Sequence, residues 1–238
     1  MSGVFFYLSR NPDAYDKLAQ EIRTTFSSSS SGKDIKQGPR LSGCKYLRAV
    51  IEETMRLSPS ALSPPWRQQD PASVAAGEYF VVDGHVIPPG TQVAVSNYDL
   101  QHNEECFPEP YRFLPERWLE EQDSDSPSFS EEKGKKKMAD KRAFAPFLLG
   151  DRSCAGRPMA YVEMSLTIAK VMYYFDFARP DDSEEVEEAR LGEGWGPPGG
   201  LRGRRDEFQL YVGIVVEHKG PKLRFTPRGE YWRELMDE

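Results

Sequence analysis

Cys154 has the surroundings in this sequence that most clearly suggest chemistry. It stands in the segment 147–156, FLLGDRSCAG, which has the pattern F-x-x-G-x-R-x-C-x-G. Gly150 can supply a tight turn before the cysteine, because glycine adopts backbone conformations that other residues avoid. Pro158 suits the first turn of a helix behind it, where amide N–H groups and the helix dipole favour a thiolate anion. These surroundings favour a reactive thiolate, and the alternative is a structural cysteine buried in a loop.

The fixed positions of this segment resemble the proximal haem loop of the cytochrome P-450 family: Phe147, Gly150, Arg152, Cys154 and Gly156. The resemblance implies that Cys154 is the axial ligand of the haem iron and that haem b is the cofactor. It implies that Arg152 meets a haem propionate as a charge-assisted pair. Gly156 removes a side chain where the backbone must approach the flat macrocycle, and Phe147 and Gly150 belong to the same cofactor-binding loop.

A second signature lies in the segment 45–59, KYLRAVIEETMRLSP, whose apolar residues recur at helical spacing until Pro59 ends the helix. Glu53 and Arg56 project from one face of this helix. An exposed pair at this spacing is worth only about 0.2–0.5 kcal/mol, so by itself it is weak evidence. It resembles, however, the E-x-x-R helix of the same family, whose partner arginine comes from a segment like PERW at 115–118. The resemblance implies that Glu53, Arg56 and Arg117 form a buried structural triad.

Two further residues match the family less closely. Arg67, in PPWR at 64–67, stands where family members place an arginine that reaches a haem propionate. The alternative is an arginine in a solvated loop. His102 precedes the PERW segment, where many members carry a histidine near the haem edge. Its alternative is a structural histidine with satisfied hydrogen bonds.

The composition is that of an ordinary globular chain. The 238 residues are 38% hydrophobic and 12% aromatic, which is enough for one sizeable core. The net charge of −7 argues against a nucleic-acid partner. The cysteines, Cys44, Cys106 and Cys154, are far apart, so we expect neither a disulfide framework nor a C-x-x-C site, and a reducing compartment is the default. We expect no membrane-spanning segment, because the apolar run at 4–8 is far shorter than the roughly 20 residues needed.

Helical patterns must supply most of the framework that positions these residues. A helical pattern covers 1–26, and Pro12 opens a second helix within it. A long helix is predicted over 157–177, directly after the cysteine. Its apolar residues lie almost all round the helix, which indicates burial.

Strand patterns predict two short hairpins. Asp83-Gly84 is a turn signal between the halves of the segment 80–87, and Pro89-Gly90 turns the chain into a strand at 91–95. A second hairpin is predicted between 208–216 and 222–225, with its turn at 219–221.

We therefore predict one partial domain over 1–238, with a mixed, mainly α fold and small β-sheets. The resemblance implies the C-terminal half of the cytochrome P-450 fold, which comprises helices, two short hairpins, a meander, the haem-binding cysteine loop and a long buried helix. Three flexible segments are predicted, at 27–40, 120–141 and 181–206, because they are serine-rich, charged without periodicity, or acidic and then rich in glycine and proline.

The resemblance covers only the C-terminal half of the family. Before this point, family members carry a membrane anchor, most substrate-contacting helices, and a central helix with an acid/alcohol pair that delivers protons to bound oxygen. We expect the distal wall of the haem site to be missing from this sequence. Family members are often anchored to the endoplasmic reticulum membrane, whereas a chain without the anchor is cytoplasmic or of unknown location.

Two classes of function are compatible with these patterns. The first is a haem-thiolate monooxygenase that inserts one oxygen atom of dioxygen into an apolar small molecule, with electrons from NADPH through a flavoprotein reductase. The second is a truncated, non-catalytic fragment with little or no autonomous haem binding or turnover. Basic residues ahead of the haem loop are candidate contacts for an acidic reductase, the alternative being a solvated loop: Lys135, Lys136, Lys137, Lys141 and Arg142. The segments 115–118 and 1–26 resemble those of fungal members.

Overall fold

The computed structural model describes residues 1–27, 31–119, 139–180, 190–197, 203–212 and 216–236. Within these ranges the helices are α1 (Ser2–Leu8), α2 (Pro12–Thr25), α3 (Pro39–Ser42), α4 (Lys45–Leu57), α5 (Pro71–Ala75), α6 (Asn97–Gln101) and α7 (Arg157–Tyr174). The strands are β1 (Arg67–Gln68), β2 (Phe80–Val82), β3 (His85–Ile87), β4 (Gln92–Val93), β5 (Phe175–Ala178), β6 (Leu210–Tyr211), β7 (Glu217–His218) and β8 (Arg224–Pro227). The predicted fold class, mainly helical with small sheets, is confirmed.

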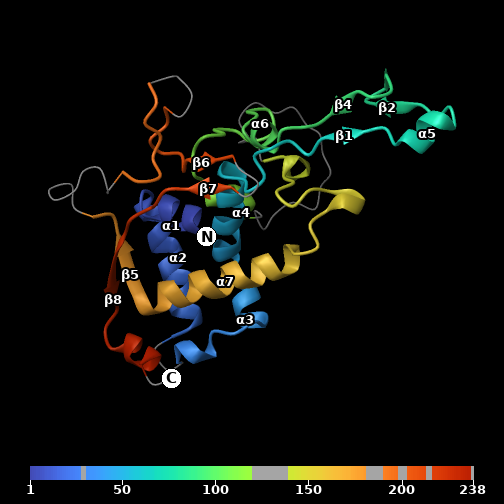
Figure 1. The fold of residues 1–238 in the computed structure, drawn as a ribbon. Helices are drawn as coiled ribbons and strands as arrows, with labels where there is room; N and C mark the ends of the chain where they lie inside the picture. Colours follow the sequence, from blue (N-terminus) through green and yellow to red (C-terminus); the bar gives the residue numbers. More distant parts are fainter. Residues whose placement is uncertain (28–30, 120–138, 181–189, 198–202, 213–215, 237–238) are drawn as a thin grey trace, which may run out of the picture.

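The hydrophobic core lies where α1, α2, α4 and α7 meet, and Figure 1 shows α7 running across the other three helices. In α4 the apolar residues recur at helical spacing, so Leu47, Val50 and Ile51 face the core with at most 1% of their surface exposed. The amide groups of Tyr46 and Leu47, at the N-terminal end of α4, donate hydrogen bonds to Glu21 of α2. This carboxylate satisfies backbone donors that a helix end leaves without partners.

Helix α7 is shorter than the sequence suggested. We predicted a helix over 157–177, but α7 ends at Tyr174, and Phe175–Ala178 forms β5. Residues 175–178 leave the helical conformation because they form an antiparallel ladder with β8. The expected all-round burial is also wrong for the first turns, since Met159 is 73% exposed while Ile168 and Met172 are fully buried.

The first predicted hairpin is present. β2 pairs with β3 through the turn at Asp83 and Gly84, whose φ angles are 48° and 76°. Positive φ at both central positions matches the right-handed twist of the flanking strands. The predicted strand at 91–95 appears as β4, which pairs with β1. Figure 1 shows these strands and α5 extending away from the helices, and no residue from 71 to 96 is buried.

The second predicted hairpin has a different pairing. β6 pairs with β7, so the hairpin forms within 210–218. The predicted partner strand at 222–225 belongs instead to β8, which lies beside β5. The aromatic rings of Phe177 and Phe225 stand opposite each other in that ladder, with centroids 5.6 Å apart. This cross-strand aromatic contact favours the long-range partner.

Part of the predicted flexible segment 27–40 packs against the core. Ile35 is 1% exposed, and Ser31 Oγ and the Gly32 amide donate hydrogen bonds to Glu234 near the end of the chain. The flexibility of this segment stays a prediction. The other two predicted flexible segments, 120–141 and 181–206, lie in large part outside the described residues.

Candidate functional site

The predicted cysteine loop is closed by one backbone hydrogen bond. The Cys154 amide donates to the Phe147 carbonyl at 2.8 Å, so the two ends of the segment meet. Leu148 and Gly150 have φ angles of 61° and 71°, which turn the chain sharply between these ends. Only glycine adopts such angles without steric cost, so Gly150 has the conformational role that the sequence indicated. α7 follows at once, and its first turn contains Pro158.

The loop presents the Cys154 thiol to the outside. Cys154 is a free cysteine and is exposed, not buried. A Cβ atom at Gly156 would lie 3.6 Å from the Cys154 sulfur, so a larger side chain there would stand beside the thiol. Leu149 and Met159, which flank the thiol in sequence, are 67% and 73% exposed. Exposed apolar side chains on both sides of the cysteine in sequence suit a flat, apolar ligand.

Phe147 anchors the loop to the core. Its ring lies 5.5 Å from that of Tyr161 on α7, and it packs against the main hydrophobic cluster. The loop is therefore fixed at its start by an aromatic contact and at its end by the N-terminal turn of α7. Such anchoring holds a ligand atom at a defined position while leaving it accessible.

The two candidate propionate partners differ in their contacts. Arg152 lies in the single 3-10 turn Gly150–Arg152, and its exposed side chain forms no hydrogen bond or ion pair with the described residues. Arg67 lies in β1, and its Nη1 donates to the carbonyl groups of Pro65 and Trp66 at 3.3 and 3.1 Å. The guanidinium of Arg152 thus projects into solvent, whereas that of Arg67 is turned back onto its own loop.

His102 is buried, with 7% of its surface exposed, and it ends α6. Its ring stacks on Tyr98 at 4.0 Å, and Nδ1 lies 2.8 Å from the Tyr98 carbonyl. Burial lowers the pKa of His102 to about 4, and this backbone contact opposes the shift only in part. The neutral ring therefore donates through Nδ1–H, which leaves Nε2 as a buried acceptor without a partner among the described residues.

The predicted triad is a buried network centred on Glu53. Its carboxylate accepts hydrogen bonds from Arg56 Nε and Nη2, both at 2.9 Å, and from Arg117 Nε at 3.0 Å. The sequence reasoning missed two further donors, the Trp118 indole at 2.9 Å and the Leu114 amide at 2.9 Å. Trp118 stands inside the PERW segment, so its position next to Arg117 was the available signal. The side chains of Glu53 and Arg56 are fully buried, and that of Arg117 is 4% exposed.

The two arginines also bind backbone carbonyl groups at the end of α6 and in the irregular segment between α6 and the PERW segment. Burial lowers the pKa of Arg117, and the Glu53 carboxylate acts in the opposite direction. The guanidinium groups donate to backbone carbonyls of Gln101, Pro108, Glu109, Pro110 and Arg112. Because a buried ion costs several kcal/mol unless it is fully paired, this set of partners holds the irregular segment in one conformation.

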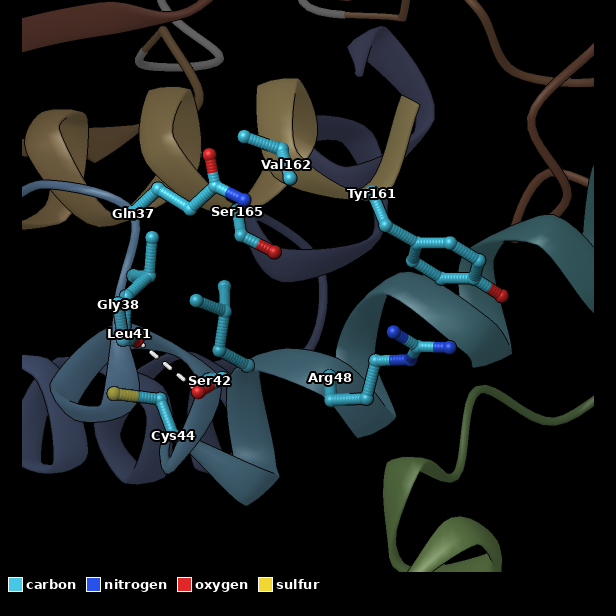
Figure 2. A pocket seen from close by; sticks show the side chains of 10 residues that line it. Gln37, Gly38, Leu41, Ser42, Cys44, Arg48, Tyr161, Val162 and Ser165 are labelled. Carbon is cyan, nitrogen blue, oxygen red and sulfur yellow. Dashed lines mark hydrogen bonds between the residues drawn. The ribbon is translucent and has the colours of Figure 1, made fainter. Parts of the chain in front are cut away.

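A pocket of about 290 Å³ lies between α7 and the segment that carries α3 and the start of α4. Figure 2 shows Val162 and Ser165 of α7 on one side and Ser42 and Cys44 on the other. The Arg48 guanidinium lies 3.4 Å from the centre of the Tyr161 ring. None of the predicted site residues lines this pocket, so it is separate from the cysteine loop.

The residues of the cysteine loop and its surroundings fit haem. An exposed thiol, a glycine beside it and exposed apolar neighbours match what a flat macrocycle with a central iron requires. The orphaned Nε2 of His102 is a polar atom that still requires a partner. Across the described ranges, no helix is both long and apolar enough to cross a bilayer.

Comparisons with known proteins agree with the resemblance seen in the sequence. The Cytochrome P450 family profile matches residues 1–199. Cytochrome P450 monooxygenase atnE of Emericella nidulans is 36% identical over 228 residues, which cover 96% of this chain and 38% of that protein. Monooxygenase apf8 of Gibberella fujikuroi is 39% identical, with 96% and 55% covered, and AKT7 of Alternaria alternata is 36% identical, with 94% and 40% covered. The chain thus spans about two fifths to just over half of the length of these fungal relatives.

Proposed function

Because the chain belongs to the cytochrome P450 family, we propose that it forms the cysteine-side part of a haem-thiolate monooxygenase. The observation that carries this proposal is the exposed Cys154 thiol, held by a closed loop at the start of α7. The proposed reaction inserts one oxygen atom of dioxygen into an apolar small molecule. The relatives are named monooxygenases, which supports the reaction class.

Each loop residue has a proposed role in binding haem b. Cys154 is the iron ligand, and Phe147 and Gly150 hold it in place. Gly156 leaves open the space beside the thiol, where a Cβ atom would lie 3.6 Å from the sulfur. Arg152, which forms no ion pair with any described residue, is free to bind a propionate.

Arg67 and His102 are weaker candidates for haem contacts. Arg67 would have to leave the carbonyl groups that it binds in its own loop. His102 has its Nδ1–H committed to Tyr98, so its Nε2 can donate to a carboxylate only when the ring is protonated. In the neutral ring, Nε2 can only accept a hydrogen bond, so it requires a donor as its partner.

When bound at Cys154, haem would supply the activation of dioxygen. We propose that the electrons come from NADPH through a flavoprotein reductase. The residues of this chain bind the cofactor and fix the sulfur. Of the proposed reductase contacts, Lys135, Lys136 and Lys137 lie outside the described residues. Arg142 is described and pairs with Asp140 at 2.7 Å, with 91% of its side chain exposed. It is accessible to an acidic partner.

A second candidate function is a non-catalytic chain that binds haem weakly by itself. The exposure of Cys154 and Leu149 favours it, because a haem face left in water loses its hydrophobic stabilisation. In this case the scaffold is folded but turnover is absent. The two candidates differ in haem affinity and in coupled product formation.

The test is a haem titration of the full chain, followed by reduction and addition of carbon monoxide. Thiolate ligation gives a strongly red-shifted Soret band, which we expect for the parent chain and for Cys106→Ala but not for Cys154→Ala. A Cys154→Ala chain that keeps this band would overturn the assignment. Peroxide release and substrate oxidation with a reductase then separate the two candidates, since uncoupled turnover releases peroxide without product.

A further inference from the structure

A second pocket lies apart from the cysteine loop, beside the β6–β7 hairpin. Its volume is about 400 Å³, which is within the usual range for small-molecule sites. Trp195 and Tyr211 provide aromatic surface, Gln209 provides an amide, and Arg190 and Lys219 provide positive charge. None of the residues from 147 to 156 lines it.

The wall of this pocket is held rigidly against the hairpin. The backbone N–H of Gln209 donates to the Gly192 carbonyl at 2.8 Å, and the backbone N–H of Gly194 donates to the Arg204 carbonyl at 2.9 Å. A Cβ atom at Gly192 would lie 2.9 Å from the Phe208 ring, so the two chain segments are already in close contact. Phe208 in turn packs on Phe6 of α1, with ring centroids 5.0 Å apart. The pocket is therefore pre-formed.

The charge of the pocket is positive. Its acidic residue, Glu193, has 8% of its side chain exposed and is bound by Arg10 at 2.9 Å. Glu193 also forms ion pairs with Arg179 and Arg190, both at 3.5 Å, so three arginines of the described ranges surround this one carboxylate and leave an excess of positive charge. Lys219 forms no ion pair with the described residues. A positive pocket stands out in a chain whose net charge is −7.

We propose that this pocket binds a planar aromatic carboxylate. The aromatic body lies against Trp195 and Tyr211, and the carboxylate is bound by Lys219 and Arg190. Aromatic surface contributes apolar contact with a preference for flat ligands. The cationic groups select an anion over its neutral analogue, because a desolvated carboxylate needs charged donors.

The test uses 2-naphthoate as the probe and 2-naphthamide as its neutral analogue, with calorimetric titration of the full chain. We expect naphthoate to bind at least tenfold more tightly than naphthamide. Lys219→Gln should weaken naphthoate by about tenfold and leave naphthamide unchanged, whereas Lys45→Gln, an exposed lysine on α4, should change neither. Trp195→Ala should weaken both probes, and Trp66→Ala, at another exposed tryptophan, should weaken neither.

Trp195 is 76% exposed and Lys219 is also exposed, so both substitutions are compatible with folding, which melting curves verify. Equal affinity for the two probes would overturn the proposed charge selection. Unchanged naphthoate binding in both Trp195→Ala and Lys219→Gln would place the probe elsewhere and overturn the site.

Discussion

The network around Glu53 and the loop around Cys154 differ in how far they bury their central side chain. Glu53 is fully buried and accepts five hydrogen bonds from four residues. Cys154 is exposed, and its loop is held by backbone contacts and by Phe147 at one end. The same chain therefore encloses one charged group completely and presents one thiol openly.

The difference shows which of the two groups finds all of its partners among the described residues. A buried ion must be satisfied by its own fold, because the cost of leaving it unpaired is several kcal/mol. A ligand-binding atom must stay accessible, so its final surroundings include the ligand. The Glu53 network is satisfied by the chain itself, whereas the Cys154 loop leaves its thiol open, as the proposed role in haem binding requires.

Substitution of Glu53 should have the largest effect on stability. In Glu53→Gln, Arg56 and Arg117 lose their buried counter-charge, and we expect a loss of about 3–5 kcal/mol in the free energy of unfolding. Urea denaturation measures this change. Glu52→Gln is the matched control, since Glu52 pairs with Arg48 at the surface, and it should cost at most about 0.5 kcal/mol. Similar costs for the two variants would show that the network has no special role.

The titration of His102 should give the next largest effect. Its pKa in the folded chain is about 4, below the ordinary value of 6.5, so the unfolded chain binds more protons between these values. The contribution of His102 to the free energy of unfolding is then fully present above pH 6.5, and it is lost as the pH drops towards 4. The shift corresponds to a loss of about 3 kcal/mol at most.

The measurement is the free energy of unfolding between pH 4 and 7. We expect His102→Phe to flatten this dependence, because phenylalanine keeps the stacking surface and does not titrate. His85→Phe is the control, since His85 is exposed in β3. A slope that survives in His102→Phe would show that another group causes it.

A substitution of Gly150, in the turn before the cysteine, should lower stability although this turn is exposed. Gly150→Ala forces alanine into a φ of 71°, which costs about 1–2 kcal/mol. Gly156→Ala is the matched glycine with an ordinary φ of −76°, and we expect almost no loss of stability. Thermal melting of the two variants checks this difference, and equal melting temperatures would contradict it.

The smallest effect on stability should come from Cys154 itself. Because the thiol is exposed, Cys154→Ala should change the free energy of unfolding of the cofactor-free chain by less than about 0.5 kcal/mol. The same variant should lose thiolate-ligated haem completely. A large loss of stability without haem would show that the sulfur has a packing role, which would remove the contrast with Glu53.

Local sequence patterns determined the parts of this protein that depend on neighbouring residues. The spacing of apolar residues in α4 placed Glu53 and Arg56 on one face, and Asp83-Gly84 specified its hairpin through backbone angles. The pattern around Cys154 also led to the correct family, because its glycines and cysteine have geometric requirements within ten residues. Each of these conclusions needs only short-range geometry.

Tertiary structure decided what depends on distant partners. Strand β8 pairs with β5 and not with the strand before it, and the ring of Phe225 contacts that of Phe177 across this ladder. The Trp118 and Leu114 donors to Glu53, and the burial that keeps His102 neutral, arise only when separate segments pack together. Sequence periodicity records which face of an element is apolar, but hydrogen-bond partners and pKa values follow from the surroundings that packing creates.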